Sequence, residues 1–247
     1  MPGTFFADDW QSYRMDSRDP HAAVETPDRE IGVVEDALGH LCAAGVIDHT
    51  EYDHERFLAH RRAVAELFEI PWTAITPRMQ RLIYALNAIR RPVNMIAAGV
   101  FCGNTFISNA GAAVGPGACY EARNLIGVEI VAAEAERAER NVRRIDPTRI
   151  ARVVAEDARD TVREFAEEIE LLYLDADGTD ERGKGVYLDI LEASLAKMPP
   201  GGLVLAHNSI NCAERLEKYL AFVRDPANCA ASVNVAVDGE GLEVTRI

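Results

Sequence analysis

Short apolar runs alternate with longer amphipathic stretches over the last two thirds of the chain. The runs have the length and composition of buried strands, which we expect at residues 93–98, 124–130, 150–154, 169–174 and 203–206. The stretches between them space their apolar positions as helices do, at residues 105–114, 132–144, 161–168, 187–198 and 214–223. Residues 232–247 are typical of a closing hairpin. Strands separated by helices predict an α/β fold, with a parallel sheet that helices cover on both faces.

The N-terminal third has a different pattern. Residues 1–30 are polar and rich in prolines and acids, and part of this segment is expected to be loosely ordered. Its aromatic residues could instead dock on a partner subunit or cover a pocket. Residues 31–70 have helical spacing, and a helix start marked by proline follows at residue 77. We therefore predict a helical N-terminal extension over residues 1–75, as a lid or dimer interface, and a main domain over residues 76–247.

Composition and charge exclude two classes of partner. The chain has 247 residues, of which 48% are hydrophobic and 27% charged, and its net charge is −14. Nucleic acid and anionic membrane surfaces do not attract so acidic a protein. No apolar run approaches the roughly 18 residues of a membrane span, and the five scattered cysteines lack the spacing of a zinc or redox motif. We expect a cytoplasmic protein without nucleic acid or membrane partners.

Residues 93–105 combine an apolar run, two glycines and a helix start, in the sequence VNMIAAGVFCGNT. Gly99 and Gly103 allow the backbone to approach a ligand closely, and the helix start offers free N–H groups to an anion. The spacing Gly-x-x-x-Gly does not meet the dinucleotide fingerprint Gly-x-Gly-x-x-Gly. We interpret this segment as the first strand-to-helix turn of a nucleotide-type site, and an ordinary turn without a ligand is the alternative.

Polar residues follow the other predicted strands at their carboxyl ends, where ligands bind in parallel sheets. These residues are Glu129, Asp157, Asp175, His207 and Asn208. Glu129 can accept hydrogen bonds from both hydroxyls of a ribose, and the alternative is a surface glutamate. Asp157 can reach a purine amine or cap the helix that follows it. The last three residues could hold a divalent cation, or they could be turn residues without a metal.

Six segments, in chain order over residues 75–247, carry a resemblance to one known family: AAGVFCGNT, GVEIVAAEAERAERNV, AEDARD, LYLDAD, PPGGLVLAHNS and DGEGLEVTRI. They are similar to the S-adenosylmethionine-dependent O-methyltransferases of the catechol and caffeoyl-CoA type. The resemblance implies a Rossmann-like class I methyltransferase fold with a mostly parallel seven-stranded sheet. It also implies that S-adenosylmethionine is the cofactor, that the acceptor is a small molecule and that the protein is a homodimer.

The resemblance also assigns roles to individual positions. The cofactor-binding positions that it implies are Ala97, Gly99, Gly103, Thr105, Glu129, Asp157 and Asp175. The glycine-turn residues would lie at the methionine end of the cofactor, the glutamate would bind the ribose, and the first aspartate would lie beside the adenine. The positions that it implies for a divalent metal such as magnesium are Asp175, His207 and Asn208.

Several positions depart from the family pattern. Ala97 stands where the family has an acidic cofactor anchor, and His207 stands where it has a metal-binding aspartate, which favours a softer ion or no metal. The family's catalytic lysine is expected at the position of Gly178. Lys184, three residues before Tyr187, restores the Lys-x-x-Tyr spacing after about six inserted residues. The family's tryptophan loop over the acceptor is missing, so that a lid could come from the N-terminal region.

The hypothesis that follows is transfer of a sulfonium methyl group to a hydroxyl, for example that of a phenol. Asp175 and Asn208 would orient the acceptor, and Lys184 or His207 would act as the general base, which for a lysine requires a depressed pKa. One alternative is a degenerate methyltransferase fold that binds a nucleoside or a partner protein without turnover. Another is an NAD-linked dehydrogenase, which fits the alternation of strands and helices but lacks the dinucleotide fingerprint.

Overall fold

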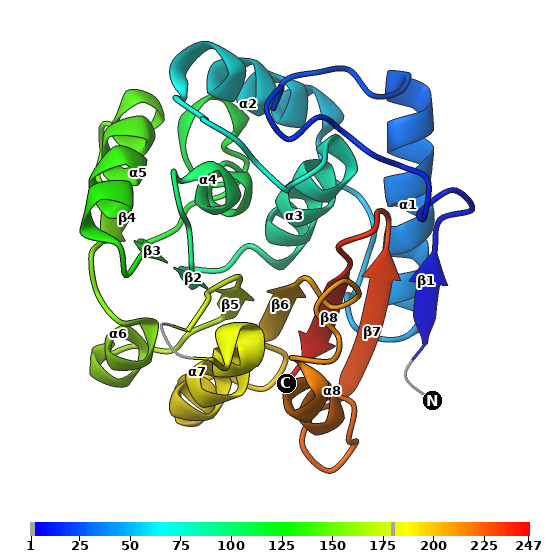
Figure 1. Cartoon of the computed structure of the whole chain (residues 1–247), viewed down its shortest axis with the longest axis vertical. Coiled ribbons are helices and arrows are strands. Elements are labelled where there is room, and N and C mark those ends of the chain that lie inside the picture. Colours follow the sequence, from blue (N-terminus) through cyan, green and yellow to red (C-terminus); the bar gives the residue numbers. More distant parts are fainter. Residues whose placement is uncertain (1–2, 179–180) are drawn as a thin grey trace.

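Eight strands form one sheet in the computed structural model, which describes residues 3–178 and 181–247 (Figure 1). The strands are β1 Thr4–Phe6, β2 Asn94–Ala98, β3 Asn124–Val128, β4 Ala151–Val154, β5 Leu171–Leu174, β6 Leu203–His207, β7 Ala231–Ala236 and β8 Leu242–Arg246. Their order across the sheet is β1-β7-β8-β6-β5-β2-β3-β4. All neighbouring pairs are parallel except those that involve β8, which runs antiparallel to both β6 and β7.

Helices cover both faces of the sheet, and each face has its own hydrophobic core (Figure 1). The helices on one face are α1 Pro27–Ala43, α2 His54–Leu67, α3 Pro77–Arg90, α4 Asn104–Ala110 and α5 Ala132–Ile145. Those on the other face are α6 Ala158–Glu164, α7 Val186–Ser194 and α8 Glu217–Val223. Three short 3₁₀ turns are η1 Gly115–Gly117, η2 Gly183–Gly185 and η3 Leu195–Lys197. The central strands β2, β5 and β6 are buried at every position, which explains their continuous apolar sequences.

The predicted α/β fold with a mostly parallel sheet is confirmed, but the sheet has one strand more than the seven expected. The additional strand is β1, which pairs in parallel with the outer edge of β7, Thr4 opposite Asn234 and Phe6 opposite Ala236. Its β-branched and aromatic residues suit a strand. A strand of three residues is too short to show a periodic pattern, so only the tertiary structure reveals it.

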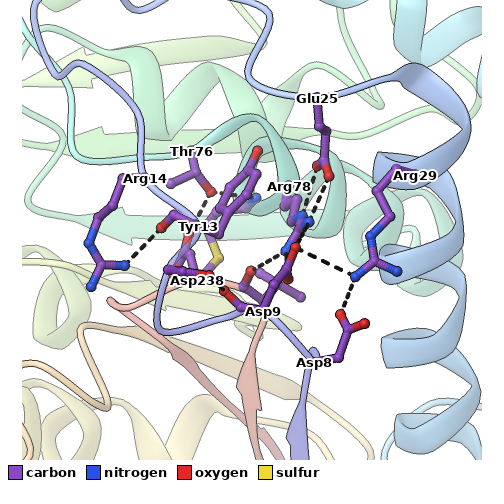
Figure 2. Close-up of polar contacts among 12 residues, drawn as sticks. Asp8, Asp9, Tyr13, Arg14, Glu25, Arg29, Thr76, Arg78 and Asp238 are labelled. Atoms are coloured by element: carbon purple, nitrogen blue, oxygen red, sulfur yellow. Dashed lines mark hydrogen bonds and ion pairs between the residues drawn. The ribbon is translucent and has the colours of Figure 1, made fainter.

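Arg78 connects the polar N-terminal segment to the first turn of α3 (Figure 2). Its guanidinium is completely buried and donates to both carboxylate oxygens of Asp9, at 2.6 and 2.9 Å, and of Glu25, at 2.7 and 2.6 Å. The same group lies 3.8 Å from the centre of the Tyr13 ring. This part of the N-terminal segment is therefore bound to α3, and loose order elsewhere in the segment stays a prediction.

Thr76 connects the start of α3 to the turn between β7 and β8. Its hydroxyl accepts a hydrogen bond from the N–H of Met79, as a helix cap does, and donates to Asp238 at 2.5 Å (Figure 2). The predicted helix start at Pro77 is thus confirmed. Because Arg78 also donates to the carbonyl of Val237 at 3.1 Å, the N-terminal segment, α3 and the β7–β8 turn meet at one buried polar cluster.

The N-terminal helices share a core with the rest of the chain. Val34 and Leu38 of α1 and Val64 of α2 belong to the same hydrophobic cluster as α3, α4 and one face of the sheet. The division at residue 75 stays a prediction. None of the helices that the structure describes is long and apolar enough to cross a membrane.

Candidate functional site

A cavity of about 540 Å³ opens at the carboxyl ends of β2, β3, β5 and β6. Most of the site residues predicted from the sequence line it, namely Gly99, Thr105, Glu129, Asp157, Asp175, Lys184, His207 and Asn208. Two do not line it: Ala97 is buried within β2, and Gly103 begins α4 and packs against α5. The structure therefore brings together residues that are more than 100 positions apart, because parallel strands end at one edge of the sheet.

Gly99 is required by the geometry of the turn that follows β2. Its φ is +79°, a left-handed conformation that side chains disfavour, and a Cβ there would lie 2.5 Å from the backbone of Ala176. The turn after β2 therefore passes directly over the chain that leaves β5. Phe101, in the same turn, also has a positive φ of 47°. A non-glycine residue in this region is uncommon and occurs where the surroundings hold it in place.

Glu129 holds that turn in place. One of its carboxylate oxygens accepts a hydrogen bond from the N–H of Phe101 at 2.8 Å, and the other accepts from the N–H of Val131 at 3.0 Å. A carboxylate has about four acceptor positions, so these two bonds leave further positions for hydroxyl groups in the cavity. Glu129 is thus a fixed acceptor on the cavity wall.

Asp157 performs the capping role that the sequence offered as one of two alternatives. Its carboxylate accepts from the N–H of Arg159 at 2.8 Å at the start of α6, and forms an ion pair with the Arg159 guanidinium at 2.5 Å. The hydrogen bond from Arg159 lowers the pKa of Asp157. The residue also lines the cavity, and its proximity to an adenine stays a prediction.

Asp175 lies between two basic side chains at the bottom of the site. The ammonium of Lys184 donates to Asp175 Oδ1 at 2.7 Å and to the Asp175 carbonyl at 2.8 Å. The imidazole Nδ1 of His207 is 3.4 Å from Asp175 Oδ2. Only 10% of the Lys184 side chain and 1% of the His207 side chain are exposed. Lys184 therefore lies in the site and is not a solvated residue at a loop tip.

The pKa shifts of this group all favour charged side chains. Burial would raise the pKa of Asp175, but the positive charges of Lys184 and His207 outweigh it and lower that pKa. Burial would lower the pKa of Lys184 and of His207, and the Asp175 carboxylate raises both instead. Lys184 is therefore an ammonium at neutral pH, and it does not have the depressed pKa that a lysine base requires.

Tyr187 connects this group to the helix that follows it. Its buried hydroxyl donates to the carbonyl of His207 at 3.2 Å. The Lys-x-x-Tyr spacing thus places Lys184 against the end of β5 and Tyr187 against the end of β6. Asn208, with a positive φ of 65°, donates its amide N–H to Glu240 at 2.7 Å.

Three residues on the cavity wall were not anticipated from the sequence. Trp72 and Phe101 pack with ring centres 4.9 Å apart, and Trp72 is 49% exposed. Glu240, in the β7–β8 turn, binds Asn208. A tryptophan in a short link between two helices, outside any apolar pattern, was the signal that could have identified Trp72. Residues 72–75, at the end of the predicted N-terminal extension, also line the cavity, and a lid role for that extension stays a prediction.

These residues do not fit a divalent metal. The Lys184 ammonium already neutralises Asp175 Oδ1 at 2.7 Å, and an imidazole whose pKa is raised binds a proton in competition with a metal. Within residues 3–178 and 181–247, no group of three or more His, Cys, Asp or Glu side chains is arranged to hold a metal ion.

Comparisons with known proteins agree with this architecture. Residues 96–209 match a family model described as a methyltransferase domain. No curated protein matches the sequence. Similar solved structures include an O-methyltransferase from Bacillus cereus in complex with S-adenosylhomocysteine, which is 14% identical, with 88% of this chain and 99% of that chain covered and a TM-score of 0.59.

Two further structures have the same fold. An O-methyltransferase from Streptomyces achromogenes, involved in tomaymycin synthesis and in complex with S-adenosylmethionine, is 14% identical over 80% of this chain and 91% of its own, with a TM-score of 0.58. A methyltransferase from Podospora anserina bound to S-adenosylhomocysteine is 12% identical over 92% of this chain and 99% of its own, with a TM-score of 0.60.

Proposed function

We propose that the protein methylates a hydroxyl group of a small molecule, because residues 96–209 match a methyltransferase domain model and the fold is similar to that of solved O-methyltransferases. The observation that carries the proposal is the cavity at the strand ends, where the Gly99 turn, the Glu129 carboxylate and the Lys184–Asp175 pair meet. This arrangement combines a nucleoside-type site with a buried cation beside it.

The residues of the cavity fit S-adenosylmethionine. Glu129 would accept the ribose hydroxyls with its remaining acceptor positions. The Gly99 turn lines the cavity, and it would lie against the methionine part. Asp157 also lines the cavity and would face the adenine. When bound, the cofactor would supply a methyl group on a sulfonium.

We expect Glu129→Gln to weaken binding of S-adenosylhomocysteine by about 10- to 100-fold. The substitution removes a charged acceptor, whose hydrogen bonds contribute about 1.5–3 kcal/mol. Isothermal titration calorimetry measures the affinity. Glu136→Gln on the exposed side of α5 is the matched control and should bind as the wild type does. Equal affinities for both variants would show that Glu129 does not face the ribose.

Lys184 is the residue that would hold the acceptor. Two of its three N–H groups bind Asp175, and the ammonium is 3.4 Å from the exposed carboxylate of Asp177. An acceptor oxygen could replace this last contact. A cation within about 4–6 Å lowers the pKa of a hydroxyl by about 1–3 units, so a phenol bound here would lose its proton to water more readily. The ammonium would then donate a hydrogen bond to the oxyanion and orient it.

The other basic residue has a supporting role in this proposal. The raised pKa of His207 keeps its imidazolium populated to higher pH than in a free histidine, and its charge adds to that of Lys184. Trp72 and Phe101 offer aromatic surface at the cavity wall, which favours a flat, aromatic acceptor. In this proposal Lys184 and His207 act as cations. The general-base role that the sequence suggested for them is a separate prediction that remains untested.

Metal removal gives a second prediction. Since an ammonium takes the place of a metal beside Asp175, we expect turnover to be unchanged by EDTA and not to rise on addition of magnesium or manganese. Initial rates after dialysis against the chelator measure this. Activity that is lost with EDTA and restored by magnesium would contradict it.

A transfer assay tests the proposed function. The full chain is incubated with S-adenosylmethionine labelled in its methyl group and with a panel of phenols, catechols and aliphatic alcohols. We expect labelled ether product from a phenolic acceptor. Binding of S-adenosylhomocysteine without transfer to any acceptor in the panel would favour the alternative of a non-catalytic binding module.

Two expectations from the sequence remain part of this proposal. The homodimer is supported by the resemblance alone, and sedimentation velocity of the full chain tests it. A cytoplasmic location is supported by the five cysteines, none of which forms a disulfide among the described residues.

A further inference from the structure

A second cavity, of about 320 Å³, lies on the helical side of the molecule, away from the Lys184–Asp175 pair. Residues 20–27, α2 and α3 surround it, and Asn104 and Ser108 on one side of α4 form its inner wall. Asn104 also lines the first cavity, and its side chain donates to Thr73 at 3.0 Å. The two cavities are therefore neighbours, and Asn104 belongs to the walls of both. The volume of the second cavity is at the lower end of the range for small-molecule sites.

The second cavity contains an ionic group of two arginines and one glutamate. Glu30 accepts from both terminal nitrogens of Arg61, at 2.9 and 2.8 Å, and from Nε of Arg81 at 2.5 Å. Arg81 is 1% exposed and Glu30 5%. Two guanidinium groups thus share one carboxylate, and Arg61 also donates to the carbonyl of Pro77 at 2.8 Å. Nε of Arg61 is buried and has no hydrogen-bond partner among the described residues.

Arginines outnumber carboxylates by one among the residues that line the cavity, which include Arg61, Arg81, the exposed Arg62, Glu25 and Glu30. Both carboxylate oxygens of Glu25 are bound by Arg78, which also binds both oxygens of Asp9 in the neighbouring polar cluster (Figure 2). Burial lowers the pKa of His60 to about 3, so this side chain is neutral. The Arg61 side chain is 28% exposed, so a ligand in the cavity that it lines would have access to it.

The remaining lining is apolar and partly aromatic. Phe57 lies beneath both guanidinium groups, with its ring centre 4.4 Å from Arg61 and 4.3 Å from Arg81. Val24 and Leu58 add aliphatic surface. A cavity that combines two arginines with apolar walls suits a ligand with one anionic group on an apolar body, because guanidinium groups bind carboxylates in a fixed planar geometry.

We propose that this second cavity is a binding site for a small organic carboxylate, whose charge is neutralised by Arg61 and Arg81 and whose apolar part lies between Phe57 and residues 20–27. The site is independent of the proposed methyl transfer, since none of its charged residues belongs to the first cavity. It is also formed in part by the N-terminal segment that Arg78 holds in place.

Calorimetry on the full chain tests this, with benzoate, 3-phenylpropionate and hexanoate as probes and their neutral amides as matched controls. We expect at least one acid to bind, its amide to bind at least about tenfold more weakly, and saturating S-adenosylhomocysteine not to displace the acid. Arg61→Gln should weaken binding of the acid by at least about tenfold. Arg140→Gln removes the same charge from the exposed side of α5 and should leave the affinity unchanged.

Several outcomes would overturn the proposal. These are no binding by any of the three acids, equal binding of acid and amide, or binding that Arg61→Gln leaves unchanged. The comparison of acid with amide uses the wild type alone, so it decides the matter even where the melting temperature shows that Arg61→Gln is poorly folded. Failure of methyl transfer would leave each of these results unaffected.

Discussion

Arg78→Met is expected to lower the free energy of unfolding by about 3–5 kcal/mol. The guanidinium of Arg78 is completely buried and binds both Asp9 and Glu25, and only 11% of the Glu25 side chain is exposed. Removal of the cation leaves Glu25 without a partner at a site where water cannot replace it. Burial of an unpaired charge is among the most destabilising effects of a single substitution.

The same substitution should change how stability depends on pH. The hydrogen bond from Arg78 lowers the pKa of Asp9 from 3.8 to about 2. Because the pKa in the folded state is below that in the unfolded state, this interaction stabilises the protein above about pH 4, and the stabilisation is lost as the pH falls toward 2. Arg78→Met lacks the interaction, so its stability should fall less over this range.

Urea unfolding followed by circular dichroism measures both effects. Arg29→Met is the matched control, because Arg29 also lies near Asp9, at 3.5 Å, but is 42% exposed. Its expected cost is about 0–1 kcal/mol, as for surface ion pairs. If the two variants unfold at the same urea concentration, Arg78 does not hold the N-terminal segment as described.

Lys184→Met is expected to lower kcat for methyl transfer by about 100- to 1,000-fold. Loss of one preorganised donor to a developing or bound oxyanion typically has this effect. The affinity for S-adenosylhomocysteine should change little, since the ammonium is bound to Asp175 and faces the proposed acceptor position. Lys184→Arg keeps the charge and should restore part of the rate.

Steady-state kinetics with the best acceptor from the transfer assay measures this. Lys218→Met on the exposed side of α8 serves as the control for loss of a lysine charge. Melting temperatures of all variants separate a loss of folded protein from a loss of rate. An unchanged kcat in Lys184→Met would remove this residue from the mechanism.

The strands, the helices and the location of the site could be predicted from the sequence for one physical reason. Buried parallel strands are continuous apolar runs, and their carboxyl ends converge on one edge of the sheet. Polar residues directly after such runs, as Glu129 and Asp175 are, therefore line one cavity. This argument predicts that Glu129 lies on the cavity wall, but not that it binds the turn after β2.

Interactions between distant parts of the chain could not be predicted in the same way. The contact between Arg78 and Asp9 joins residues 69 positions apart, and neither residue stands in a recognisable motif. The position of Lys184 depends on how the inserted residues before it fold, which the Lys-x-x-Tyr spacing alone does not determine. The ion pair of Lys184 with Asp175 reverses the expected direction of its pKa shift, and this effect needs the distance between the two groups.

Binding of S-adenosylhomocysteine to the wild-type chain, measured by isothermal titration calorimetry in the presence of EDTA, tests the central claim most directly. The account predicts one site per chain with a dissociation constant in the micromolar range or below, and the same constant after addition of magnesium. Absence of binding at millimolar ligand, with and without magnesium, would contradict it, because the cavity at Gly99 and Glu129 would then not be a cofactor site.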